Sequence, residues 1–157
     1  WHQLAGVGRV ESFHGRFGTS QLDRRGSTTT RILGPQLNGE KWLAIHDSDG
    51  GELDGDLEWD RAVGPMQFIP TSWAVFAADG NGDGIRDPHN LYDAALAAAD
   101  HLCGSQLDDP SNFRAALLRY NRSSAYGRNV TRFAERYHEL IVIVSPWDSE
   151  APSRPDA

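Results

Sequence analysis

The chain has 157 residues, the length of one typical domain, and 39% of them are hydrophobic. This apolar content excludes a mostly disordered chain. Because no run approaches about 18 consecutive apolar residues, the sequence also predicts no membrane-spanning helix. The formal net charge of −7 argues against a protein that binds nucleic acid by neutralising phosphates.

Five helices are expected from the spacing of apolar residues and from capping residues. Four of the expected ranges are residues 1–11, 70–78, 91–103 and 110–120, and the last helix is expected to begin at about residue 124 and to include the apolar positions from Val130 to Tyr137. Asp109 before Pro110 is typical of an N-cap followed by the first helical residue, and Ser123 or Ser124 is expected to cap the last helix.

Residues 14–64 form an irregular half that is rich in glycine. Within it, residues 41–46 (KWLAIH) predict a short strand that enters a Gly50-Gly51 turn. The sequence therefore predicts one mainly α domain over residues 1–144, with a long loop and short-hairpin insertion. Residues 145–157 are expected to form a Pro/Ser-rich tail or linker.

The single cysteine, Cys103, excludes an internal disulfide and a zinc site built from several cysteines. Its apolar neighbours predict a buried side chain rather than a reactive thiol. The chain begins at Trp1 without a charged and apolar leader, so we expect a trimmed mature fragment whose targeting signal lies elsewhere.

Glu11 lies at the expected end of the first helix, in the segment RVESFHG. The negative end of the helix dipole and the apolar neighbours Val10 and Phe13 both favour the protonated carboxyl group. A protonated carboxyl is what a general acid acting on a glycosidic oxygen requires. The alternative is a solvated glutamate at the surface.

Two further segments carry polar groups among apolar residues. In Gly64–Pro70 (GPMQFIP), Gln67 is either a buried, hydrogen-bonded amide or a group that orients sugar hydroxyl and acetamido groups. Tyr120-Asn121 closes the fourth helix, where Asn is also a common helix terminator.

Taken in order, these motifs resemble the lytic murein transglycosylases. The segments are Val-Glu-Ser after an apolar helix, then Gly-Pro-Met-Gln-Phe-Ile-Pro-Thr-Ser-Trp, then Tyr-Asn. The chain is most similar to the branch related to membrane-bound lytic transglycosylase B, in the short form of actinobacteria. The resemblance covers roughly Leu4 to Tyr137 and implies a lysozyme-like α+β fold.

The resemblance also implies roles for individual residues. Glu11 would be the catalytic acid/base, and Ser12 would support it within the substrate-binding set. The remaining residues of that set are Met66, Gln67, Phe68, Tyr120 and Asn121.

Residues 79–85 (DGNGDGI) fit the first half of a calcium loop. Asp79, Asn81 and Asp83 supply oxygen ligands at positions 1, 3 and 5, and Ile85 supplies a carbonyl at position 7. A turn without metal is the alternative.

Position 12 of this loop is Asn90 rather than the usual Glu, so Asp93 or Asp87 would have to close it. The resembled branch carries a lengthened EF-hand-like loop with a final Asp, which implies a structural Ca²⁺ ion and favours Asp93. No organic cofactor is expected.

The acidic stretch Asp47–Asp60 is interpreted as a solvated loop, with a second metal site or a second catalytic carboxylate as alternatives. The histidines lack the spacing of a zinc hydrolase. His14 lies three residues after Glu11 and is interpreted as a solvent-exposed residue at a helix end, with a side chain that reaches the cleft as the alternative.

The resemblance implies cleavage of the bond between N-acetylmuramic acid and N-acetylglucosamine, leaving 1,6-anhydro ends. The alternatives are a lysozyme-type muramidase, which needs a second carboxylate, and a non-catalytic peptidoglycan-binding module. We expect an exported monomer that acts on peptidoglycan in the cell wall and binds no nucleic acid.

Overall fold

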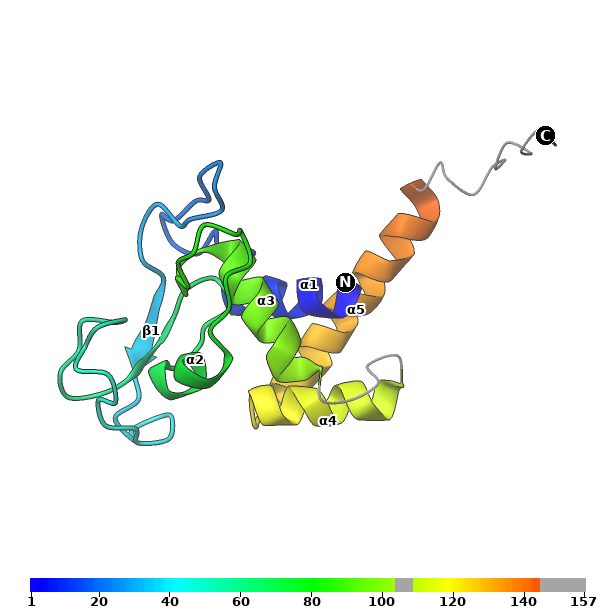
Figure 1. Ribbon diagram of the computed structural model, residues 1–157. Coiled ribbons are helices and arrows are strands. Elements are labelled where there is room, and N and C mark those ends of the chain that lie inside the picture. The colour runs from blue at the N-terminus through cyan, green and yellow to red at the C-terminus, as the bar shows by residue number, and fades with distance from the viewer. Residues whose placement is uncertain (104–108, 145–157) are drawn as a thin grey trace.

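The structure, a computed structural model, describes residues 1–103 and 109–144, with side chains described as far as Leu140. The expected tail over residues 145–157 therefore lies outside the described residues. In chain order, the elements are α1 (His2–Ser12), β1 (Leu33–Gln36), β2 (Arg61–Val63), α2 (Pro70–Phe76), α3 (Leu91–Leu102), α4 (Pro110–Tyr120) and α5 (Ser124–Val144) (Figure 1). The expectation of a mainly α domain is confirmed, with one small two-stranded sheet in the described part of the chain.

Helices α4 and α5 begin close to where the sequence predicts them, and both have the side-chain caps that it predicts. The Asp109 carboxylate accepts a hydrogen bond from the backbone N–H two residues ahead, at 2.7 Å. The cap of α5 is Ser123 rather than Ser124, with its Oγ accepting from the Tyr126 N–H at 3.3 Å. Asn90 caps α3 in the same way. Each cap satisfies an N–H group that has no partner within its helix.

The core forms where α1 packs against α5, the most extensive contact between two elements (Figure 1). Val7 and Val130 are fully buried at this contact. Gly6 lets the two helices approach, because a Cβ atom there would lie 2.7 Å from the Val130 carbonyl oxygen. Close approach of the helices thus depends on a residue without a side chain.

The sheet pairs β1 with β2 in antiparallel orientation, with Leu33 opposite Val63. The strand expected over residues 41–46 is wrong, since Ala44 and His46 form isolated bridges only. Trp42 and Leu43 remain 56% and 66% exposed. A strand is stabilised by burying one face, and no second layer covers this segment.

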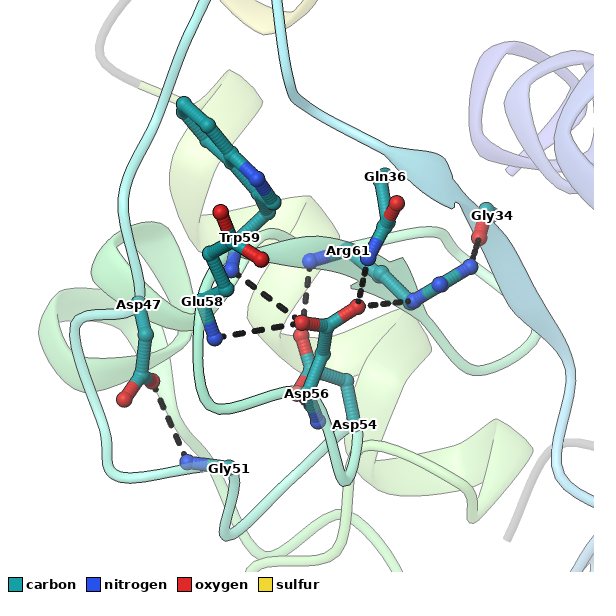
Figure 2. A network of polar contacts seen from close by, with 9 residues as sticks. All are labelled: Gly34, Gln36, Asp47, Gly51, Asp54, Asp56, Glu58, Trp59 and Arg61. Atoms are coloured by element: carbon teal, nitrogen blue, oxygen red, sulfur yellow. Dashed lines mark hydrogen bonds and ion pairs between the residues drawn. The ribbon is translucent and has the colours of Figure 1, made fainter.

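The acidic stretch is folded, which corrects the interpretation as a solvated loop. Asp54 and Asp60 are buried, and an Asp54 oxygen accepts a hydrogen bond from the Arg61 N–H at 2.6 Å. The Asp56 carboxylate accepts hydrogen bonds from Nε2 of Gln36 at 2.6 Å and from Nε of Arg61 at 2.9 Å (Figure 2). The hydrogen bonds, foremost that from Gln36, lower the pKa of Asp56 to about 2. These hydrogen bonds therefore connect the acidic stretch, residues 47–60, to β1 and β2.

Cys103 is exposed at the end of α3, which corrects the expectation of a buried thiol. The buried face of α3 is formed instead by Ala94, Ala97, Ala98 and Leu102. None of the helices in the described ranges combines the length and the apolar character that crossing a bilayer demands.

Candidate functional site

A tight turn, Gly64–Gln67, lies at the centre of the candidate site. Val63 and Phe68 flank it and exchange two backbone hydrogen bonds of 2.8 and 3.0 Å, which close the hairpin. Gly64 and Gln67 have φ values of 75° and 51°. The left-handed region suits glycine, whereas the same conformation at Gln67 is uncommon for a residue with a side chain.

The three carbonyl groups of residues 64–66 accept hydrogen bonds from side chains that the sequence singles out. The donors are Nε2 of Gln67 at 2.9 Å, Oγ of Ser12 at 2.6 Å and the hydroxyl of Tyr120 at 2.8 Å. The turn therefore joins the ends of α1 and α4, and it brings three of the expected site residues together.

Ser12 connects the turn to the end of α1. Its side chain is fully buried, and its Oγ also accepts the Gly15 N–H at 2.8 Å. Both functions of the hydroxyl are thus used within the protein. This geometry holds the last turn of α1, and with it Glu11, beside the Gly64–Gln67 turn.

The amide nitrogen of Gln67 donates hydrogen bonds within the protein, and its amide oxygen is available to accept one from a ligand. Its Nε2 donates to backbone carbonyls of residues 64 and 32, the latter at 3.4 Å. Within residues 1–103 and 109–140, Oε1 takes part in no hydrogen bond. The amide can therefore present an acceptor to a substrate N–H or hydroxyl group.

Glu11 is half-buried at the end of α1. Burial raises the pKa of its carboxyl group to about 7, and the nearby Tyr126 hydroxyl opposes the rise. Burial together with the charge of Glu11 also raises the pKa of Tyr120 and of Tyr126. A carboxyl group that titrates near neutrality can give up and take back a proton under ordinary conditions.

The sequence reasoning missed Tyr126. The side chain is only 8% exposed, and within the described ranges its hydroxyl has no partner at hydrogen-bond distance. Its hydroxyl nevertheless lies close enough to Glu11 to lower the pKa of the carboxyl group. Its position on an apolar helix face is typical of a core residue, so the pattern alone gave no sign of this proximity.

Replacing Tyr126 by phenylalanine removes the hydroxyl that lowers the pKa of Glu11, so we expect that pKa to rise above about 7. At pH 4.5, where Glu11 is protonated in the folded state, the free energy of unfolding should stay the same or increase, because a buried hydroxyl without a partner carries a desolvation penalty. A ¹³C NMR titration of the glutamate carboxyl groups measures the pKa. Tyr137→Phe is the matched control, and an unchanged pKa in Tyr126→Phe would contradict the expectation.

Met66 and Phe68 lie in the core, with exposed fractions of 1% and 2%. Met66 contributes its backbone carbonyl to the site through Tyr120, whereas its side chain points toward α1 and lies near Gly8. The Phe68 ring contacts the rings of Trp73 and Tyr120 edge to face, at centroid distances of 5.4 and 5.9 Å. These side chains therefore pack in the core beside the Gly64–Gln67 turn.

Asn121 ends α4, and its Oδ1 accepts a hydrogen bond from the Ser123 N–H at 3.1 Å. It thereby fixes the short connection between α4 and α5, whose first residues include Tyr126. The helix-terminating role that the sequence suggests is present in the structure, next to the expected site residue Tyr120.

His14 is half-buried, which corrects the interpretation as a solvent-exposed residue. Its Nε2 and the Tyr137 hydroxyl share a hydrogen bond of 2.7 Å. Burial, followed by the charges of Arg9 and Arg16, lowers the pKa of His14. The neutral imidazole therefore links the residues after α1 to α5.

The loop over residues 79–93 is closed by Asp93, which is 1% exposed. The Asp93 carboxylate accepts the N–H groups of Gly80, Asn81 and Asp87 at 2.8, 3.2 and 3.0 Å. Asp87 instead accepts the N–H of residue 89. Asp93 therefore holds the two ends of the loop together through hydrogen bonds, while the choice between Asp87 and Asp93 as the closing metal ligand stays a prediction.

The donor atoms of this loop are right in kind for a hard cation, because they are carboxylate, amide and carbonyl oxygens. In the structure, Asp79 and Asp83 direct their oxygens to backbone N–H groups of residues 82–85. The loop carboxylates form no group of three with oxygens within 4.8 Å of one another. Among the described residues, Asp47, Asp49 and Asp60 alone form one.

Comparison with known protein families identified a similar domain. Residues 43–109 match the family model described as Transglycosylase SLT domain. This match covers 67 of the 157 residues and supports a similarity to the lytic transglycosylases, whose SLT domain implies a lysozyme-like fold. The matched segment contains the Gly64–Gln67 turn and the 79–93 loop, whereas Glu11 and Tyr120 lie outside it. Comparisons with curated proteins and with solved structures gave no match.

Proposed function

We propose that this chain is a lytic transglycosylase of the branch related to membrane-bound lytic transglycosylase B, with Glu11 as its single acid/base. The observation that carries the proposal is the half-buried Glu11 carboxyl, whose pKa is raised to about 7 beside the Gly64–Gln67 turn. The family match over residues 43–109 supports the substrate class independently, because it does not include Glu11.

In the proposed reaction, the Glu11 carboxyl donates its proton to the oxygen that links N-acetylmuramic acid to N-acetylglucosamine. The bond from C1 of the muramic acid to that oxygen breaks, and the acetamido oxygen of the same sugar stabilises C1. The Glu11 carboxylate then removes the proton of the C6 hydroxyl, and O6 attacks C1. The product is a 1,6-anhydro end, Glu11 regains its proton, and no water is consumed.

The electrostatic surroundings of Glu11 favour one catalytic carboxylate over two. A second carboxylate within the roughly 5–9 Å that glycoside hydrolases use would raise the pKa of Glu11 by charge repulsion. Within residues 1–103 and 109–140, the pKa shift of Glu11 comes instead from burial and from Tyr126, and no other carboxylate contributes to it. This supports internal attack by the substrate over hydrolysis by a muramidase.

Analysis of the reaction products tests this proposal. Purified sacculi are incubated with the protein, and the soluble muropeptides are analysed by mass spectrometry. We expect products that end in 1,6-anhydromuramic acid and are lighter by one water than hydrolysis products. Reducing ends would identify a muramidase instead, and binding without release would identify a non-catalytic peptidoglycan-binding module.

We also propose that the 79–93 loop binds a structural Ca²⁺ ion through Asp79, Asn81, Asp83, the Ile85 carbonyl and Asp93. The support is the type and spacing of these oxygen donors and the burial of Asp93. The ion would stabilise the loop that connects the Gly64–Gln67 turn and α2 to α3. It would take no part in the chemistry at Glu11.

Calcium is expected to raise the free energy of unfolding, by about 2.7 kcal/mol when its concentration is 100 times the dissociation constant. Asp83→Asn should lose this gain, while its stability in EDTA stays close to that of the wild type because Asp83 is exposed. Thermal unfolding with and without calcium measures both. Asp49→Asn is the control, and a gain lost only in that variant would assign the ion to Asp47, Asp49 and Asp60.

A further inference from the structure

A groove lies between α4 and α5, with a volume of about 310 Å³. We call it the α4–α5 groove. Arg114, Arg128 and Arg132 line it, together with Leu118, Gly127 and Glu135. The residues of the candidate site, Glu11 and the Gly64–Gln67 turn, are not among its lining residues.

The three arginines of the α4–α5 groove are exposed, and none of them forms an ion pair with another described residue. Within the described ranges, the one ion pair of the chain joins Arg61 to Asp56. Arg132 lies over the neighbouring Phe133 ring at 5.1 Å, and this contact leaves the guanidinium free to donate hydrogen bonds. Guanidinium groups are suited to bind carboxylate and phosphate oxygens, often through two parallel hydrogen bonds.

The charge of the chain is distributed unevenly. Residues 110–140 contain six arginines and two glutamates, although the whole chain has a net charge of −7. In contrast, residues 47–60 contain seven acidic residues and no basic one. The helical pair α4–α5 is therefore a positive region on an acidic protein, and such a region attracts anionic ligands.

The groove also offers apolar contact and space. Leu118 is 40% exposed, and the position of Gly127 faces open space, with no atom within 4 Å of where a Cβ would be. A ligand with carboxylates on a short, partly apolar backbone fits these features better than a bare inorganic ion does.

The groove opens away from Glu11. Tyr120 on α4 and Tyr126 on α5 lie near Glu11, whereas Leu118 and Arg128 line the groove. Leu118 is two positions from Tyr120 on α4, and Arg128 is two positions from Tyr126 on α5. Residues two positions apart lie on nearly opposite faces of a helix. A ligand in the groove therefore lies on the face of the α4–α5 pair that is opposite to Glu11.

We propose that the α4–α5 groove binds the carboxylates of peptidoglycan peptide stems that belong to a strand other than the one cleaved. This proposal rests on the proposed function for its choice of anion. Peptide stems carry carboxylates at short spacing on a peptide backbone, which matches three unpaired guanidinium groups around an exposed leucine. Binding on the face opposite Glu11 attaches the protein to a neighbouring strand, while the candidate site at Glu11 binds the strand that is cleaved.

An NMR titration with a synthetic stem tetrapeptide tests the proposal. The probes are the peptide with free carboxylates, its carboxamide analogue and inorganic phosphate. We expect the free peptide to shift amide signals of α4 and α5 and the carboxamide analogue to leave them unchanged. The variant with Arg114→Gln, Arg128→Gln and Arg132→Gln should bind about tenfold more weakly.

The control variant carries Arg24→Gln, Arg25→Gln and Arg136→Gln, which removes the same charge outside the groove and should bind like the wild type. Equal binding of the carboxamide analogue, equal loss in the control variant, or shifts confined to other elements would overturn the proposal. Binding of phosphate without the peptide would also overturn it and would point to a phosphate-bearing polymer. Because the tetrapeptide has no glycosidic bond, these outcomes do not depend on the cleavage reaction, which product analysis tests separately.

Discussion

Replacing Glu11 by glutamine is expected to abolish glycan cleavage, with a loss of about 10³-fold or more in kcat/KM. The same carboxyl group is proposed to donate a proton in the first step and to accept one in the second, and each role contributes about 10²-fold or more. Glutamine keeps the shape of the side chain but cannot exchange a proton. Release of muropeptides from sacculi measures the rate, and co-sedimentation measures the retained binding.

Glu139→Gln is the matched control, because Glu139 is an exposed glutamate on α5. It should retain wild-type activity. Cleavage by Glu11→Gln at more than about a tenth of the wild-type rate would remove Glu11 from the proposed role, whereas a loss of binding as well would point to a damaged fold.

The same variant has a second signature that does not depend on activity. The pKa of Glu11 is about 7 in the folded protein and about 4.5 in the unfolded chain. The folded state therefore binds the proton more tightly, and stability falls as the pH rises from about 4.5 through 7. Above pH 7, the ionised carboxyl costs about 3 kcal/mol, and Glu11→Gln should recover part of this amount.

Urea unfolding at pH 4.5 and pH 8 separates this effect from a general change in packing. At pH 4.5, Glu11 is protonated in the folded state and about half protonated in the unfolded chain, so its ionisation changes the free energy of unfolding by less than about 0.5 kcal/mol. The variant and the wild type should therefore have similar free energies of unfolding at this pH. At pH 8, the variant should be the more stable of the two. A difference in the free energy of unfolding that is independent of pH would mean that burial does not raise the pKa of the Glu11 carboxyl group.

The helices of this fold could be read from the sequence because their determinants are local. Asp109 and Ser123 cap α4 and α5 as expected. The turn at Gly64–Gln67 was also recognisable as a motif. What the motif did not reveal is that its carbonyl groups accept hydrogen bonds from Ser12 and Tyr120, which are more than 50 residues away along the chain.

The failures share a physical cause, since each depends on contacts between distant segments. The strand expected over residues 41–46 lacks a layer on which to pack. Asp54 and Asp60 are buried because Arg61 and Ser48 donate hydrogen bonds to them, which no charge pattern reveals. Tyr126 reads as a core residue, and only the packing of α5 against α1 brings its hydroxyl near Glu11.

Replacing Gly64 by alanine is expected to lower the free energy of unfolding by about 3 kcal/mol or more. Gly64 has a φ of 75°, and a Cβ atom there would overlap the Pro88 carbonyl group. The backbone itself would have to move, and this adds to the cost of a left-handed conformation. Because the same turn anchors Ser12 and Tyr120, the site should lose its alignment together with the stability.

Gly55→Ala separates the two contributions. Gly55 has a similar φ of 80°, but no atom lies within 4 Å of a Cβ placed there. Its substitution should cost only the conformational part, about 1 kcal/mol. Urea unfolding of both variants gives the comparison. Equal losses in the free energy of unfolding would mean that the contact between the turn and Pro88 does not constrain the site. A much larger loss for Gly64→Ala would show that this contact stabilises the Gly64–Gln67 turn.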